Sequence, residues 1–379
     1  MTNNKDKKVL NVPNLRFPEF TGEWASYKIS DILRIGNGKD YKHLNKGDIP
    51  VFGTGGQITS VNECLYDGET TFIGRKGTIN KPFYYNGKFW TVDTLFYTHS
   101  FKIVEPKFVF CLFQTINWLR YNEASGVPSL SKDTIEKIKV NIPRIEEQKK
   151  ISLLLFAIEE RIMLQNKIIE KYESLIQAII YQKKMDGIRE GNWQKTELSK
   201  VLQERTEKNI NGYTVCSVSV SQGVINQIEY LGRSFAAKET SHYNVVKYGD
   251  IVYTKSPTGD FPYGIVKRSY IKNAVAVSPL YGVYKPINDS IGVFLHFYFM
   301  QSNNAFNYLH PLIQKGAKNT INITNDRFLG NSIPFPKAED EATYIANALT
   351  SIQTKIDIER SLLRSYEKEK QYLLRQMFI

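Results

Sequence analysis

Two cationic side chains stand next to each other between glycines in the segment Gly74-Arg75-Lys76-Gly77. Arginine can donate two hydrogen bonds to guanine O6 and N7, and lysine suits phosphate oxygens. A tight turn that presents both cations could therefore contact DNA. An exposed turn with solvated charges has the same sequence, so this alternative stays open. The segment Lys255-Ser256-Pro257-Thr258-Gly259 is the counterpart in the second half of the chain.

Glycine-bearing loops supply the other candidate contacts. The run Gly53-Thr54-Gly55-Gly56 allows close approach of the backbone to a ligand, and it is not a P-loop because no Gly-Lys-Ser/Thr follows it. Similar loops precede the last expected strand of each half, and ordinary surface turns would look alike. The candidate DNA-binding residues are Gly53, Thr54, Gly55, Arg75, Lys76, Ser125, Lys255, Ser256, Thr258, Lys315, Lys318 and Asn319.

No constellation in the sequence points to catalysis. The five histidines have no metal-ligand spacing, so no metal site is expected. The segment Asn80-Lys-Pro-Phe83 departs at its second residue from an amino-methyltransferase motif. We find no glycine-rich loop that opens a helix after a strand, no nuclease-like cluster and no helicase motif. The sequence therefore predicts no catalytic residues and no cofactor in this chain.

The positive charge of the chain is confined to two parts of it. Residues 1–145 carry 20 Lys and Arg against 14 Asp and Glu, and residues 191–336 carry 15 against 9. The segments 146–190 (8 against 8) and 337–379 (7 against 7) are neutral. Two equally basic blocks, each with a net charge of +6, are what two surfaces facing one polyanion would have. Solvated surface lysines are an equally good reading of the charge alone.

Three widely spaced cysteines form no disulfide framework, which favours a reducing compartment. The first ten residues are polar, and the apolar runs are too short to span a bilayer. We therefore expect a cytoplasmic protein with no membrane partner.

The basic blocks alternate with two long helical patterns. Apolar residues recur at steps of four and three over 146–185, and the pattern repeats 194 positions later. A repeat of 3.5 residues held for about four heptads is typical of a coiled-coil seam. One polar position interrupts both patterns, at Gln165 and Glu359. The predicted seam residues are Ile151, Leu155, Ile158, Ile162, Tyr172, Ile345, Leu349, Ile352, Ile356 and Tyr366.

The basic blocks also match each other at their starts, where Trp24 and Leu33 correspond to Trp193 and Leu202 with one offset of 169. Both blocks consist mainly of short β-branched and aromatic runs between turn residues. The sequence thus predicts a leader at 1–14, a domain at 15–145, a helix at 146–185, a hinge at 186–191, a domain at 192–336 and a helix at 337–379. If the helices pack antiparallel, as we favour, a pseudo-twofold axis relates the halves.

This order, together with several motifs, resembles the specificity subunit of type I restriction-modification systems. The motifs are Leu15-Arg-Phe-Pro-Glu-Phe-Thr-Gly-Glu-Trp24, Val51-Phe-Gly-Thr-Gly-Gly-Gln-Ile58, Phe72-Ile-Gly-Arg-Lys-Gly-Thr78, Lys88-Phe-Trp-Thr-Val-Asp-Thr94 and Ile142-Pro143 before Glu147-Gln148. The resemblance implies an α+β fold with two duplicated, β-rich target-recognition domains, separated by two long helices that pack as an antiparallel coiled coil.

The same resemblance implies a non-catalytic subunit whose domains each read one half of a bipartite site on double-stranded DNA. The helices would fix the gap and dock two methyltransferase subunits, which hold S-adenosylmethionine. Restriction subunits with ATP and Mg would complete the nuclease. Two other functions stay open: a stand-alone DNA methyltransferase, and a coiled-coil adaptor with basic nucleic-acid-binding domains.

Overall fold

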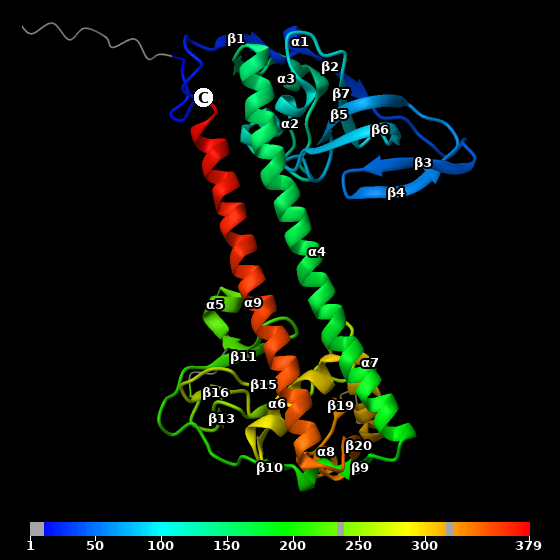
Figure 1. Cartoon of the computed structure of the whole chain (residues 1–379), viewed down its shortest axis with the longest axis vertical. Helices are drawn as coiled ribbons and strands as arrows, with labels where there is room; N and C mark the ends of the chain where they lie inside the picture. The colour runs from blue at the N-terminus through cyan, green and yellow to red at the C-terminus, as the bar shows by residue number, and fades with distance from the viewer. Residues whose placement is uncertain (1–10, 233–238, 316–320) are drawn as a thin grey trace, which may run out of the picture. The chain divides into compact units, whose positions relative to one another are not determined.

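A computed structural model of the chain describes residues 11–232, 239–315 and 321–379 (Figure 1). The chain forms two compact units. Unit 1 comprises Met1–Asn166 and Ser361–Ile379, and unit 2 comprises Lys167–Arg360. Each long helix therefore contributes one part of its length to each unit, which differs from the separate domains and helices expected from the sequence. Ten of the fourteen residues of the expected leader lie outside the described residues.

A six-stranded sheet forms the centre of unit 1, with the strand order β2-β7-β5-β6-β3-β4. All neighbouring strands pair antiparallel except β3 and β6, which pair parallel. Aromatic and apolar side chains from four strands, with Phe72 and Phe89 fully buried, form one core of the sheet. The strands are β2 (Arg34–Asn37), β3 (Lys46–Gly53), β4 (Gly56–Val61), β5 (Tyr66–Gly74), β6 (Phe83–Thr91) and β7 (Leu95–His99).

The rest of unit 1 joins the ends of the domain to the long helices. Strand β1 pairs antiparallel with β8, and a second core contains the buried Trp24 and Phe108 together with Ile151 of α4 and Phe378 beyond α9. These elements are β1 (Ala25–Lys28), α1 (Ile29–Ile32), α2 (Pro106–Thr115), the 3₁₀ helix η1 (Trp118–Tyr121), α3 (Lys132–Lys137) and β8 (Lys139–Ile142).

Unit 2 has a four-stranded antiparallel sheet with the order β10-β17-β14-β15, so β15 is an edge strand. Four two-stranded pairs accompany it: β11 with β12, β13 with β16, β18 with β19, and β20 with β9. Helix α6 begins after Asn288, whose side chain accepts from the Ile291 amide. The structure is thus mixed α/β with β-rich parts.

The elements of unit 2 have the following bounds. The strands are β9 (Trp193–Glu197), β10 (Leu202–Glu204), β11 (Cys216–Ser219), β12 (Gly223–Asn226), β13 (Asn244–Val246), β14 (Ile251–Tyr253), β15 (Val266–Arg268), β16 (Val275–Val277), β17 (Gly282–Pro286), β18 (Gln314–Lys315), β19 (Ile321–Asn322) and β20 (Ser332–Pro336). The helices are η2 (Leu198–Lys200), α5 (Gln227–Leu231), α6 (Asp289–Met300), α7 (Ser302–Leu309), η3 (His310–Leu312) and α8 (Asn325–Gly330).

The two long helices are α4 (Ile145–Arg189) and α9 (Glu339–Gln376). In unit 1, Glu159 pairs with Lys370, and Arg161 lies over the Tyr366 ring. In unit 2, Glu173 pairs with Arg360 at 2.6 Å, and Lys183 lies over the Tyr344 ring. Within each unit, the contacting positions rise along α4 as they fall along α9, so the two helix segments run antiparallel.

The predicted seam positions of both helices are buried or half-buried in their units. Helix α4 ends four residues later than expected, so most of the expected hinge at 186–191 is helical. Its glycine is explained by packing, because a Cβ on Gly187 would lie 2.0 Å from Trp193 Cδ1. The long helix α4 thus extends through Gly187 into the segment expected as a hinge.

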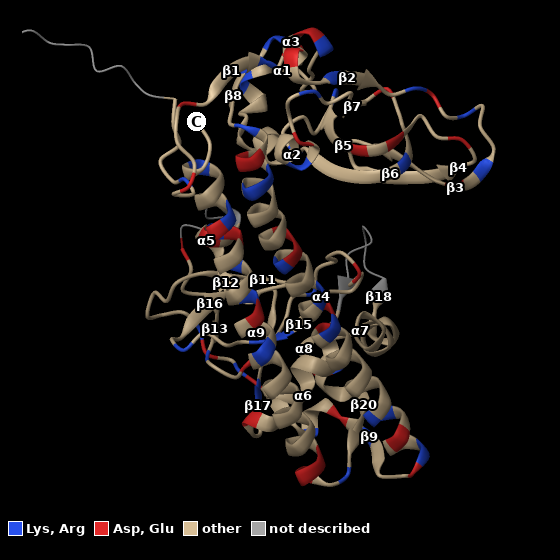
Figure 2. Ribbon diagram, turned by 45° about the horizontal axis from the view of Figure 1, so that its top comes forward, with Lys and Arg blue, Asp and Glu red and all other residues tan. Residues whose placement is uncertain are grey.

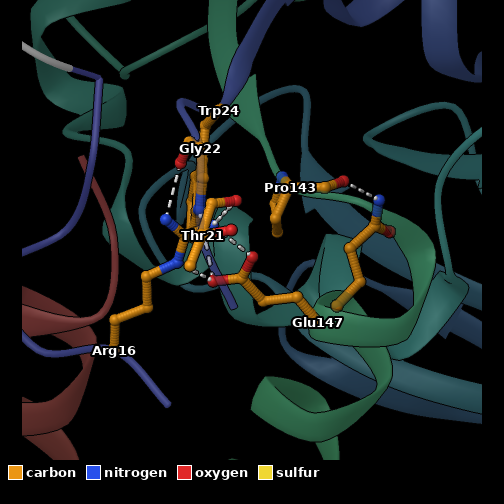
Figure 3. A network of polar contacts seen from close by, with 7 residues as sticks. Arg16, Thr21, Gly22, Trp24, Pro143 and Glu147 are labelled. Carbon is orange, nitrogen blue, oxygen red and sulfur yellow. Dashed lines mark hydrogen bonds and ion pairs between the residues drawn. The ribbon is translucent and has the colours of Figure 1, made fainter. Parts of the chain in front are cut away.

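A buried carboxylate fixes the start of α4 (Figure 3). Glu147 is 2% exposed and accepts from Arg16 Nε and Nη2, each at 2.7 Å, and from Trp24 Nε1 at 3.4 Å. The Arg16 Nη1 atom donates to the Gly22 carbonyl at 2.6 Å. The segment before β1 is thereby held to the first turn of the long helix.

Unit 2 contains the same arrangement in a simpler form. Trp193 Nε1 donates to Glu341 Oε1 at 2.9 Å, in the first turn of α9. Strand β9, which begins at Trp193, pairs with β20, just as β1 after Trp24 pairs with β8. In both units a tryptophan therefore anchors the pair of terminal strands to the beginning of a long helix.

Candidate nucleic-acid interface

The predicted cationic turn of unit 1 follows directly from the end of β5. A glycine is required there because a Cβ on Gly74 would lie 2.3 Å from the Thr78 carbonyl oxygen. Arg75 and Lys76 come next, and both are exposed. The Arg75 Nη1 atom donates to the Asp93 carbonyl at 3.2 Å. Its other guanidinium donors bind no described residue and are available to a ligand.

Backbone hydrogen bonds join this turn to the loop before α3. The Gly77 amide donates to the Pro128 carbonyl at 2.8 Å, and the Leu130 amide donates to the Arg75 carbonyl at 2.9 Å. Lys76 and Ser129 form an antiparallel bridge between these bonds. Two segments that are about fifty residues apart in the sequence therefore form one surface.

The glycine-rich turn lies beside the same surface. It is the turn of the hairpin formed by β3 and β4, in which Gly53 pairs with Gly56. A Cβ on Gly77 would lie 3.9 Å from Thr54 Oγ1, so Thr54 is a neighbour of the cationic turn. The space around Gly55 is open, and Gly56 has a φ of +108°. The structure thus brings together all three predicted segments of unit 1.

Ser125 occupies a loop that a single asparagine shapes. Asn122 Oδ1 accepts from the Ala124 amide at 3.1 Å and from the Ser129 amide at 2.9 Å, and its Nδ2 donates to the Ala124 carbonyl. Ser125 is exposed in this loop, and Val127 is 67% exposed. An ordered loop that presents exposed side chains can contact a ligand with little loss of conformational entropy.

A hollow of about 500 Å³ lies between the turn and the start of α3. Figure 2 shows that both signs of charge meet at α3. Lys132 and Glu123 also line the hollow, and neither residue belongs to the candidates predicted from the sequence. Hydrogen bonds from Thr134 and Ser131 lower the pKa of Glu123, so this carboxylate stays ionised. The hollow therefore offers cationic donors and an anionic acceptor, the two groups that distinguish base edges.

The corresponding turn of unit 2 uses its lysine differently. Lys255 has a left-handed φ of +56°, and its Nζ donates to Asn325 Oδ1 at 3.0 Å. Burial lowers the pKa of this half-buried lysine. Its side chain is thus engaged within the unit, and the exposed candidates in this turn are Ser256 and Thr258. Two backbone hydrogen bonds of 3.0 Å between Thr258 and Phe261 close the turn.

The remaining candidates of unit 2 belong to the segment of β18 and β19. Lys315 is the last residue of β18, and its backbone pairs with Ile321. Lys318 and Asn319 lie outside the described residues. The structure thus describes the backbone position of one of these three candidates.

No group of three or more His, Cys, Asp or Glu side chains that could hold a metal ion occurs in residues 11–232, 239–315 and 321–379. In the same described residues, no helix is long and apolar enough to cross a membrane.

Residues 21–174 match the family model of the type I restriction modification DNA specificity domain. A protein of Mycoplasma pneumoniae that is provisionally named a type I specificity subunit is 28% identical over 205 residues, which cover 47% of this chain and 70% of that protein. The specificity subunit of the type I restriction enzyme MjaVIII from Methanocaldococcus jannaschii is 23% identical, with coverage of 98% and 95%.

A solved structure has the same fold. The type I restriction-modification system S subunit from M. genitalium superposes with a TM-score of 0.63 at 12% identity, covering 97% of this chain and 99% of the other.

Proposed function

We propose, from the premise that residues 21–174 belong to the family of type I restriction-modification DNA specificity domains, that this chain is the DNA-recognition subunit of a type I complex. The resemblance expected from the opening motif and from the start of the long helix is confirmed by this match. Specificity subunits are non-catalytic, so the chain is not an enzyme by itself. Each unit would read one half of a bipartite target in double-stranded DNA.

The observation that carries this proposal is the joining of the cationic turn to the loop before α3. Arg75 and Lys76 lie on a backbone that is fixed on one side by β5 and on the other by Ser129 and Leu130. Rigid placement favours the bidentate hydrogen bonds that distinguish one base from another. Further lysines of the basic block would add phosphate contacts that depend strongly on salt.

Two half-sites require two reading units, and the repeated anchor supports a duplication. Trp24 donates to Glu147, and Trp193 donates to Glu341. Glu341 lies 194 positions after Glu147, the same offset that relates the two helical patterns. Within each unit the segments of α4 and α9 run antiparallel to each other, which supports an antiparallel coiled coil. We propose that these helices relate the two units by a pseudo-twofold axis and fix the gap between the half-sites.

Exposed apolar side chains on α4 support a docking role for the helices. Leu153 is 73% exposed and Leu164 48% in unit 1, and Leu175 is 43% exposed in unit 2. Exposed apolar residues of this kind are common at protein–protein contacts. We propose that two methyltransferase subunits dock on the helices. S-adenosylmethionine would belong to those subunits, and ATP and Mg to the restriction subunits.

A charge-removal experiment tests the recognition surface of unit 1. Arg75→Ala with Lys76→Ala in the complex with the methyltransferase should weaken specific DNA binding by about 1–3 kcal/mol for a lost base contact. The slope of log affinity against log salt should fall by about 1 for a lost phosphate contact. Methylation of the target, measured by single-molecule sequencing, should decline accordingly.

The matched control removes two cations elsewhere in unit 1. Lys102→Ala with Lys137→Ala changes the net charge equally at two exposed positions. This control should retain affinity and methylation close to wild type. Undiminished methylation at an unchanged site in the Arg75/Lys76 variant would remove the turn from the DNA-reading surface.

A further inference from the structure

Unit 2 contains a cavity of about 450 Å³ whose lining includes none of the candidate DNA-binding residues. Its walls come from the edge strand β15, the turn before β12, helix α6, and the parts of α4 and α9 that belong to unit 2. Cavities of about 300–1,000 Å³ are typical of small-molecule sites. The cavity is therefore large enough for a ligand and is enclosed by several elements of one compact unit.

A buried lysine without a partner lines this cavity. Lys267 lies in β15, opposite the fully buried Val252 of β14, and is itself only 4% exposed. In the part of the chain that the structure describes, its ammonium has no hydrogen bond and no ion pair. An uncompensated buried cation is costly, and an anionic ligand is a common means of compensating it.

The other described cations in the wall each have an acidic partner. Arg360 pairs with Glu173 at 2.6 Å. Arg268 pairs with Asp289 and lies over the rings of Tyr248 and Tyr270, at 4.7 and 4.5 Å from their centroids. Its Nε and Nη1 atoms are buried and have no hydrogen-bond partner among the described residues. Among the described cations of the wall, Lys267 is thus the one that has no partner at all, and two donors of Arg268 are also unpaired.

The wall of the cavity also contains an acidic side chain that does not pair with Lys267. Asp357 of α9 lines the wall, is exposed to solvent and accepts from Gln353 Nε2 at 3.0 Å. It makes no ion pair with Lys267 in this structure. Its negative charge would oppose an anion in the cavity, which provides a second residue for a test.

The remainder of the wall suits a planar, partly apolar body. Phe297 and Met300 supply apolar surface, and the Tyr270 and His296 rings lie 5.4 Å apart. His296 Nδ1 accepts from the Arg268 amide at 3.2 Å, so the proton of the neutral imidazole belongs on Nε2, as a donor. The amide of Gln222 adds a donor and an acceptor at the rim. Aromatic rings and amides are the groups that bind nucleobases.

We propose that this cavity binds a small organic phosphate of the mononucleotide class, with the phosphoryl group paired to the Lys267 ammonium and the base against Phe297 and His296. The site is separate from the recognition surface of unit 1. Its existence does not depend on the proposed function, because neither Lys267 nor its neighbours were assigned to DNA contact.

Isothermal titration of the full-length protein tests the site with three probes: AMP, inorganic phosphate and adenosine. AMP should bind more tightly than phosphate, and adenosine should not bind measurably. Lys267→Met should weaken AMP binding roughly tenfold or more, since a charge-assisted hydrogen bond is lost. Lys272→Met, which removes an exposed lysine after β15, should leave AMP binding unchanged.

Asp357→Asn provides an independent variant at an exposed helix position, where folding is not at risk. Removing this repelling carboxylate should strengthen AMP binding by about two- to fivefold. Absence of AMP binding to the wild-type protein would overturn the proposal. Equal binding to the wild type and to Lys267→Met would overturn it too, and binding of phosphate alone with no gain from the nucleoside would reject the nucleotide class.

Discussion

Two lysines of unit 2 illustrate what burial does to an ammonium group. Lys255 is half-buried and donates to Asn325, whereas Lys267 is almost fully buried and has no partner among the described residues. Burial lowers the pKa of both, and the pKa of Lys267 falls to about 8. The unfolded chain holds the proton up to a pKa of about 10.4. Between these two values the unfolded state binds more protons, so the stability contributed by this residue rises with pH.

Replacing this buried lysine should stabilise the protein. Lys267→Met removes the cost of a charged buried group and should increase the free energy of unfolding at pH 7 by up to about 3 kcal/mol. The gain should shrink as the pH rises from 8 to 10, because the wild-type amine is then neutral. Urea unfolding at pH 7.0 and 9.5 measures both values. A gain that is the same at both pH values would show that the charge of Lys267 is not the cause.

Only part of the candidate interface could be located from single residues of the sequence. Arg75 and Lys76 could be found because they are adjacent in one turn between glycines. Lys132 and Glu123 were missed because the bridge between Lys76 and Ser129 brings them to the turn. Ser131 was the available signal in the sequence, because serine is a common residue just before a helix. In the structure its hydroxyl accepts from the Thr134 amide, and α3 begins at Lys132.

Among the elements, the long helices were the most predictable because their apolar period extends over many turns. Helix α4 ends four residues beyond the expected bound and includes a glycine whose role is tertiary. Gly187 accommodates the Trp193 ring, and no local pattern reveals which ring approaches a helix. The ends of the short strands of unit 2 were also hard to predict. A three-residue strand such as β14 is too short to show an alternation of apolar and polar residues.

The two glutamates that anchor the long helices should differ in their contribution to stability. Glu147→Gln replaces a carboxylate oxygen that faces the Arg16 donors with an amide donor, and should cost unit 1 about 2–4 kcal/mol. Glu341→Gln keeps an acceptor for Trp193 Nε1, the hydrogen bond described at that site, and should cost less than about 1 kcal/mol.

Thermal unfolding of the two variants measures this asymmetry. Each substitution removes one negative charge from the first turn of a long helix, so each is a control for the other. Equal losses would mean that the interaction with the helix dipole, and not the Arg16 pair, determines the contribution of these glutamates.

For the whole molecule, the order of domains and helices could be predicted, whereas the division of each helix between two compact units could not. The physical reason is that each part of a helix is buried against the domain next to it. Ile151 and Leu155 belong to the core with Trp24, and Glu341 binds Trp193. A periodic pattern reports that a helix face is buried, and does not report which domain covers each turn.

A domain exchange tests the bipartite proposal. Replacing residues 192–335 with the equivalent segment of a related subunit should change one half of the methylated site and leave the other half and the gap intact. Single-molecule methylation sequencing of cells that express the chimera and the methyltransferase gives both halves at once. A simultaneous change of both halves would contradict the assignment of one reading unit to each half-site.

The discontinuous composition of unit 1 also affects the order in which the protein can fold during synthesis. Its core includes Leu373, Leu374 and Phe378, and the Phe378 ring packs against Trp24 and Phe108. All of unit 2 is translated between the two parts of this core. Domains of multidomain chains generally fold as units, N-terminal first, as they leave the ribosome. Here the core of unit 1 cannot be completed until the residues that follow unit 2 have been made, so Trp24 and Phe108 lack their contact with Phe378 until then.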